Sequence, residues 1–227
     1  MSQEHGHADA ELNLDDRAYR FPVVTGTEGE RAIDIRQLRK KTGLITLDPG
    51  FVNTGACASE ITYLDGEKGI LRHRGYAIED LVEQCRFIEV AYLLIHDKLP
   101  DQGELQHFSE LLNQHSMIHE DMRTFFRNYP EHAHPMAVLS AMVVSLSTFY
   151  PEVEENEETD MTVTRLLSKL RTIAAFSYKK TVGEPVVYPS YRLQYCENFL
   201  NMMFSTPVRK YEVDPVVARA LDQLLIM

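Results

Sequence analysis

The chain has 227 residues, 44% of them hydrophobic, and a formal net charge of −11 at pH 7, so it can form a sizeable core in one large or two small domains. The acidic balance argues against partners that need clustered Lys and Arg, namely nucleic acid and anionic membrane surfaces. There is also no run of about eighteen apolar residues, which a membrane-spanning helix needs.

Residues 1–17 contain few β-branched or aromatic residues and predict a disordered tail. Their polar, acidic sequence lacks the basic and apolar regions of a signal peptide. The three cysteines of the chain are far apart and form no CxxC pair, which favours reduced thiols. We therefore expect a cytoplasmic protein.

Residues 18–76 predict an N-terminal β region. Two short strands are expected at residues 19–24 and 32–38, separated by a turn rich in glycine and threonine. A β-hairpin is expected further on, where two apolar runs flank the loop at residues 65–69, which has a glycine near each end. A lone hairpin is marginal in water, so this one should pack on helices or on other strands.

The second run of the hairpin ends in Arg72, His73 and Arg74. These cations can meet an anionic ligand such as a CoA phosphate. We favour the interpretation that these cations have a structural role, in which one faces solvent and another faces a helix C-terminus or an acid.

Residues 77–227 predict a helical domain, because apolar residues recur there at i, i+3, i+4 spacing. Asp101 with Glu104 forms a capping-box pattern, and Asp214 before Pro215 forms an N-cap and first-turn pair. The fold class is therefore mainly α, with small N-terminal strands and a hairpin. Further helices are expected at residues 118–128, 193–204 and 214–226.

Residues 135–150 are apolar on every face, with small serines between the large residues. A helix of this kind is normally buried against another helix or a second subunit, and sixteen residues are too few to cross a bilayer. The acidic segment at residues 152–160 predicts a solvated loop before the next long helix.

Two histidine pairs have spacings that metal sites use, but neither has an evident third ligand. His115 and His119 are four apart on an expected helix, and the simpler reading is two surface histidines. His132 and His134 alternate before a proline, and the simpler reading gives His134 a capping or packing role. We assign no metal site and no catalytic residue, since no Ser/His/Asp set, GxGxxG motif or P-loop is present.

The sequence resembles the citrate synthase family, in its bacterial hexameric type II branch, from about residue 18 to the end. The resemblance implies a large helical domain, present in part. It also implies an acyltransferase of the tricarboxylic acid cycle, which condenses acetyl-CoA with oxaloacetate and water to citrate and CoA. It implies no covalently bound cofactor. The stretches that carry it are residues 43–51, 59–76, 134–138, 165–169 and 198–207, the last reading NFLNMMFSTP.

In the family, the helix that residues 214–226 resemble leads into the catalytic segment, and this chain ends at Met227. The resemblance therefore implies the N-terminal portion of the enzyme, without catalytic residues and inactive alone. It also implies a dimer-based homo-oligomer, up to a hexamer, paired through the helix at residues 134–150. The alternative is a non-catalytic helical interaction module that pairs with a full-length synthase.

The resemblance also suggests a regulatory site. Family members that NADH inhibits use positions matching His115, Tyr150, Arg165 and Lys169 for an allosteric nucleotide site, and all four residue types are retained. Arg165 and Lys169 are i, i+4 neighbours that can present two cations to a pyrophosphate. Two positions depart from those members, however: Gln114 replaces an arginine and Val208 a cysteine. The alternative is that Arg165 and Lys169 form a solvated face or pair with the acidic loop.

Overall fold

The computed structural model describes residues 9–150 and 159–227. It divides into two compact units, Met1–Ser59 and Glu60–Met227. The expected boundary lay at residues 76–77, but the hairpin belongs with the helices. The reason is local, since the last strand of the hairpin sheet, β6 (Tyr76–Ala77), runs directly into α2 (Ile78–Gln84).

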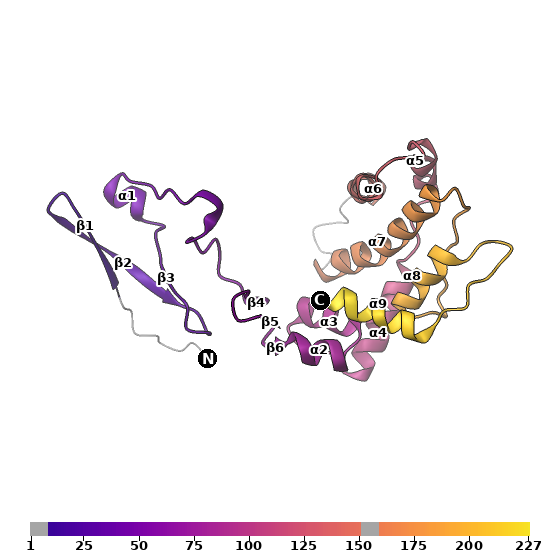
Figure 1. Cartoon of the computed structure of the whole chain (residues 1–227), viewed down its shortest axis with the longest axis horizontal. Helices are drawn as coiled ribbons and strands as arrows, with labels where there is room; N and C mark the ends of the chain where they lie inside the picture. The colour runs from indigo at the N-terminus through magenta and orange to yellow at the C-terminus, as the bar shows by residue number, and fades with distance from the viewer. Residues whose placement is uncertain (1–8, 151–158) are drawn as a thin grey trace. The chain divides into compact units, whose positions relative to one another are not determined.

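The first unit contains an antiparallel sheet in the order β1-β2-β3, formed by β1 (Asp9–Leu14), β2 (Arg17–Thr25) and β3 (Arg31–Ile33) (Figure 1). The expected strand at residues 19–24 is confirmed. The prediction of a disordered tail is wrong for residues 9–14, while residues 1–8 lie outside the described ranges. The missed signal is the pair Asp15 and Asp16, which join β1 to β2 with φ of 47° and 62°. Both central residues of a type I′ hairpin turn need positive φ, and Asp tolerates it.

The expected strand at residues 32–38 is confirmed for Ala32 and Ile33 but is wrong beyond them, because β3 ends at Ile33. The Asp34 carboxylate accepts a hydrogen bond from the Arg36 backbone N–H at 3.0 Å and pairs with its guanidinium at 2.5 Å. This contact with Arg36 lowers the pKa of Asp34 to about 2. The local turn stops the strand and leads into α1 (Leu38–Thr42), which is followed by a short 3-10 helix, Pro49–Phe51.

The second unit begins with the predicted hairpin, β4 (Thr62–Asp65) and β5 (Ile70–His73), extended by β6. Of the two loop glycines, Gly69 uses positive φ, at 66°. Arg74 donates to the carbonyl of Leu94 at 3.1 Å and lies 3.4 Å from the Asp97 carboxylate. Arg74 thus has the structural role that we favour for one cation of the run at residues 72–74, a contact with the C-terminal end of a helix.

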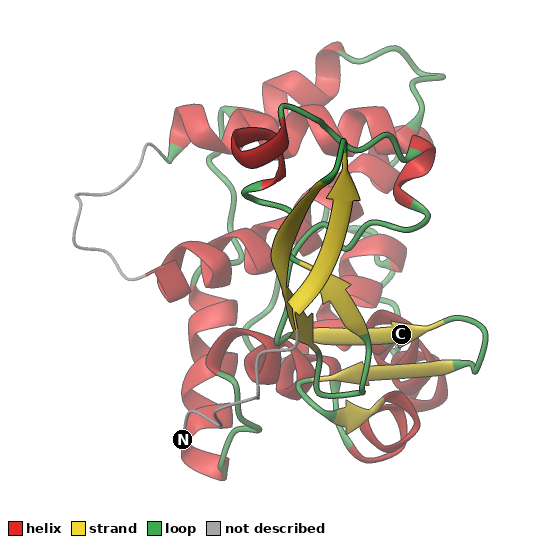
Figure 2. Cartoon of the chain, turned by 90° about the vertical axis from the view of Figure 1, so that its left-hand side faces the viewer, coloured by secondary structure: helices red, strands yellow, loops and turns green. Residues whose placement is uncertain are grey.

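The rest of the unit is helical, as predicted, and Figure 2 shows strands confined to small sheets. The long helix α7 (Thr159–Thr181) packs against four others. They are α4 (Gln102–Gln114), α5 (Met122–Asn128), α6 (Pro135–Phe149) and α8 (Tyr195–Phe204). Its Ile173 and Phe176 are fully buried against Met122 and Met142. No helix in the described part of the chain is long and apolar enough to cross a membrane. Helices α3 (Phe87–His96) and α9 (Pro215–Ile226) complete the unit.

Three predicted helix starts are confirmed in atomic detail. Asp101 accepts from the Glu104 backbone N–H at 2.8 Å, and Glu104 completes the capping box. His134 Nδ1 accepts from the N–H of Met136 at 3.2 Å, so His134 is a cap. Asp214 caps α9 in the same way.

Helix α6 is only half covered within this chain. Val138, Met142 and Leu146 lie four residues apart on the buried face. On other faces Met136 and Val144 are 58% and 73% exposed. Within the described ranges the helix is therefore not buried on all sides. The expected contact with a second subunit stays a prediction, and the acidic loop predicted before α7 falls largely outside the described residues.

Candidate functional site

Three of the four residues predicted for a regulatory site meet where α4, α6 and α7 come together. Lys169 of α7 is buried, and its ammonium donates to the backbone carbonyls of His115 at 3.0 Å and Met117 at 2.6 Å. The same ammonium lies 4.2 Å from the centre of the Tyr150 ring, at the end of α6. His115 thus contributes its backbone carbonyl to this contact.

The fourth residue, Arg165, lies one turn before Lys169 on α7 and is partly exposed. Burial, together with the smaller effect of the Arg165 charge, lowers the pKa of Lys169 to about 8. Burial also raises the pKa of Tyr150. The cluster therefore holds one permanent cation and one cation whose charge changes near neutral to mildly alkaline pH.

The histidine pair at 115 and 119 does not lie on one helix, because α4 ends at Gln114. The His119 ring instead packs against Phe149, with ring centres 4.9 Å apart, and its Nδ1 accepts from the Asp121 N–H at 3.2 Å. In the described ranges, no group of three or more His, Cys, Asp or Glu residues is placed to hold a metal ion.

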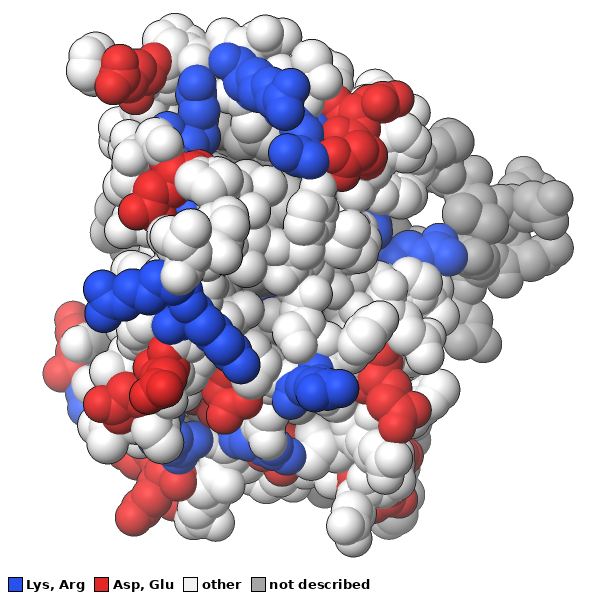
Figure 3. Space-filling view, turned by 90° about the vertical axis from the view of Figure 1, so that its right-hand side faces the viewer, with Lys and Arg blue, Asp and Glu red and all other residues white. Residues whose placement is uncertain are grey.

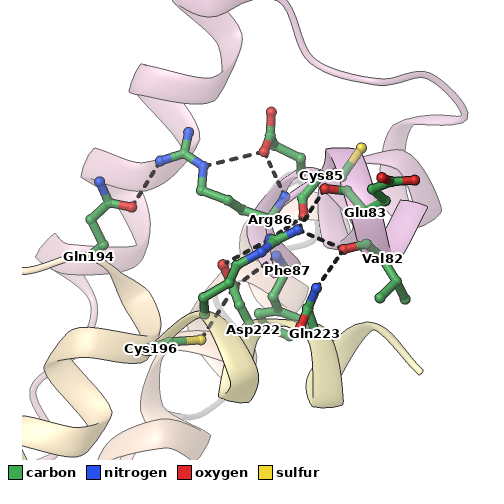
Figure 4. Close-up of polar contacts among 11 residues, drawn as sticks. Val82, Glu83, Cys85, Arg86, Phe87, Gln194, Cys196, Asp222 and Gln223 are labelled. Carbon is green, nitrogen blue, oxygen red and sulfur yellow. Dashed lines mark hydrogen bonds and ion pairs between the residues drawn. The ribbon is translucent and has the colours of Figure 1, made fainter. Parts of the chain in front are cut away.

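A second polar cluster joins α9 to the junction between α2 and α3 (Figure 4). Arg219 donates to the carbonyls of Val82 at 2.6 Å, Glu83 at 2.8 Å and Cys85 at 2.8 Å, at the end of α2. Asp222 accepts from the backbone N–H of Phe87, at the start of α3, at 2.9 Å. Arg219 and Asp222 thus bind three carbonyls at the end of one helix and one N–H at the start of the next, groups that a helix leaves without an internal partner.

The Cys196 thiol also donates to Asp222, at 3.3 Å, beside a cavity of about 170 Å³ lined in part by Arg86 and Gln194. Burial, reinforced by the Asp222 charge, raises the pKa of Cys196 far above its ordinary range. The thiol therefore stays protonated and is a poor nucleophile. The Arg86 guanidinium donates to the Gln194 side-chain carbonyl at 2.8 Å, so these two polar groups are hydrogen-bonded to each other.

Lys179, near the end of α7, is fully buried. Its ammonium donates to the Glu184 carboxylate at 2.5 Å and to the carbonyl of Ser205 at 2.7 Å. The Ser205 hydroxyl in turn accepts from the Tyr211 N–H at 2.9 Å. These bonds hold the turn that carries Val208, which is 95% exposed.

Charged residues of both signs are interspersed on the face that Figure 3 shows. Lys and Arg form separate small groups, most of them beside acidic side chains, with uncharged surface between the groups. On this face there is no continuous basic track of the kind that follows a nucleic-acid backbone.

Residues 50–227 match the family model described as the C-terminal domain of citrate synthase. Three solved citrate synthases are similar to this chain. The Thermotoga maritima enzyme is 28% identical over 80% of this chain and 46% of its own, with a TM-score of 0.66. The Pyrobaculum aerophilum enzyme is 29% identical over 90% and 48%, with a TM-score of 0.68.

The third is the Thermoplasma acidophilum enzyme, solved as a ternary complex with carboxymethyl coenzyme A and oxaloacetate. It is 25% identical over 80% of this chain and 47% of its own, with a TM-score of 0.72. The chain therefore spans about half the length of each of these three enzymes.

Proposed function

This chain belongs to the citrate synthase family, and we propose that it supplies part of the helical scaffold of an enzyme that condenses acetyl-CoA with oxaloacetate. The observation that carries the proposal is the family match over residues 50–227. The complex of the Thermoplasma enzyme with a CoA derivative and oxaloacetate supports the substrate class. We further propose the type II branch, on the stretches that resemble it, and a cytoplasmic location.

We also propose that the 227-residue chain does not catalyse the condensation by itself. The reaction needs a base within hydrogen-bond reach of the acetyl methyl group. Two charged groups of the polar clusters are already engaged: Asp222 binds an amide and a thiol, and Lys179 binds a carboxylate and a carbonyl. The chemistry is therefore assigned to groups outside these clusters.

The test is a thiol-release assay on the purified chain with acetyl-CoA and oxaloacetate. We expect no CoA release above the rate without protein, while a complete family member under the same conditions turns over. CoA release that needs oxaloacetate and rises in proportion to the chain concentration would show that the chain carries its own catalytic groups.

The exposed side of α6, with Met136 and Val144, favours pairing between subunits. We propose a homo-oligomer built on dimers, with a hexamer as the largest assembly. The same surface suits the alternative, in which the chain is an interaction module that pairs with a full-length synthase. Mixing the chain with a complete synthase distinguishes the two hypotheses. The interaction module predicts a mixed oligomer with a changed synthase rate, and the homo-oligomer alone does not.

A second proposed function is regulation by NADH through His115, Tyr150, Arg165 and Lys169. The supporting observation is that Lys169 touches both the Tyr150 ring and the His115 carbonyl, although these residues are far apart in sequence. Arg165 adds a guanidinium one turn away, which suits a pyrophosphate group.

We expect NADH binding to weaken several-fold between pH 7 and pH 9. Lys169, with a pKa of about 8, is charged at the lower pH and mostly neutral at the higher one, and an anionic ligand favours the charged form. Replacing Arg165 by Gln should weaken binding about tenfold. NADH fluorescence titration measures both effects, with R192Q as the control for loss of an exposed arginine. If NADH does not bind at either pH, the two cations have a structural role only.

A further inference from the structure

A cleft separate from the Lys169 and Arg219 clusters opens between the end of α5 and the end of α7. Its volume is about 320 Å³, at the lower end of the range for small-molecule pockets. Phe126 and Phe176 are buried at its base, with ring centres 6.0 Å apart in an edge-to-face arrangement. The lining residues are Arg123, Phe126, Arg127, Phe176, Lys180, Glu184, Pro185 and Val186.

The acidic groups near the cleft are already paired. Glu184 accepts from the buried Lys179 at 2.5 Å. Glu120 pairs with Arg123 and accepts from the Tyr188 hydroxyl at 2.7 Å. The opposing carboxylates are thereby neutralised, which leaves the cleft with an excess of positive charge.

The surplus cations are Arg127 and Lys180. Among the residues that the structure describes, the Arg127 guanidinium makes no ion pair or hydrogen bond, and Arg127 is exposed. The Lys180 ammonium has one long bond, 3.4 Å, to the backbone carbonyl of Arg127. The carbonyl end of α5 would repel an anion, and the Lys180 ammonium lies against this end.

We propose that this cleft binds a small organic anion carrying two or more negative charges. Arg127 and Lys180 hold the charged groups, and the apolar part of the ligand lies against Phe126 and Phe176. A guanidinium and an ammonium together attract an anion with two or more charges more strongly than an anion with one charge. The apolar base of the cleft excludes water from one side of each contact, which strengthens the attraction. The proposal does not depend on citrate synthase activity or on NADH binding.

Calorimetric titration of the 227-residue chain tests the proposal at fixed ionic strength. The two probes are pyrophosphate and tricarballylate, which separate phosphate ligands from carboxylate ligands, and acetate is the monovalent comparison. We expect saturable binding of at least one probe at one site per chain, and weaker binding of acetate. Arg127→Gln and Lys180→Gln should each raise the Kd about tenfold, whereas Arg127→Lys should retain most of the affinity.

The matched control is the double variant R192Q/K210Q, which removes the same total charge from exposed positions as R127Q/K180Q does. It should bind the probe as the unmodified chain does, and so should R165Q, which distinguishes this cleft from the proposed nucleotide site. Thermal unfolding of each variant verifies that it is folded. The proposal is overturned if neither probe saturates, or if R127Q/K180Q and R192Q/K210Q lose the same affinity.

Discussion

Replacing Lys179 by Ala is expected to lower the free energy of unfolding of the helical unit by about 3 kcal/mol. The side chain is fully buried, and its ammonium bonds to both Glu184 and the Ser205 carbonyl. Alanine removes both bonds, leaves the carbonyl at the end of α8 without this donor, and opens a cavity. Chemical denaturation followed by circular dichroism measures the loss.

Lys179→Met is the control for packing. The methionine side chain fills most of the volume but restores no hydrogen bond, so we expect it to cost less than alanine. Equal losses in the two variants would assign the whole effect to the polar contacts. A change below about 0.5 kcal/mol in both would contradict a stabilising role for Lys179.

The second large effect is expected at Val144, on the open side of α6. An aspartate there puts a charge into the proposed subunit contact, and we expect the dimer dissociation constant to rise at least about 100-fold, since an unpaired charge is costly to bury. Because the valine is 73% exposed within the chain, the fold of the single subunit should be unchanged. Sedimentation over a range of concentrations measures the constant.

Val208→Asp provides the matched control, since Val208 is 95% exposed and lies on a turn away from α6. It should leave the association unchanged. If the unmodified chain is a monomer at every concentration, or if both variants dissociate alike, α6 is not the contact between subunits.

Much of the helical unit could be predicted from the sequence, because its signals are local. The capping pattern at Asp101 and Glu104 and the cap at Asp214 each depend on residues within one turn. The two differences in the first unit also have local causes. Asp15 and Asp16 form a turn where the sequence predicts a tail, and the Asp34 contact with Arg36 ends a predicted strand early.

The side-chain clusters were predicted less well, because they depend on partners that are far apart in sequence. The meeting of Lys169 with Tyr150 and His115 was expected from the family resemblance alone. Arg219 and Asp222 are not among the predicted site residues, because the apolar periodicity of the last helix does not identify polar partners. Their i, i+3 spacing and opposite charges were the available signal, but it does not identify the backbone groups that they bind.

The contacts of Arg219 with the end of α2 span 134 to 137 positions of the chain. During translation, α2 and α3 leave the ribosome well before α9 exists. At about 5–20 residues per second, the interval is on the order of ten seconds. Throughout that time, water must hydrogen-bond the carbonyls at the end of α2 and the Phe87 N–H at the start of α3. The junction between α2 and α3 is therefore among the last parts of the molecule to reach its final hydrogen bonding. A nascent chain released before Asp222 is added would lack the acceptor for the Phe87 N–H.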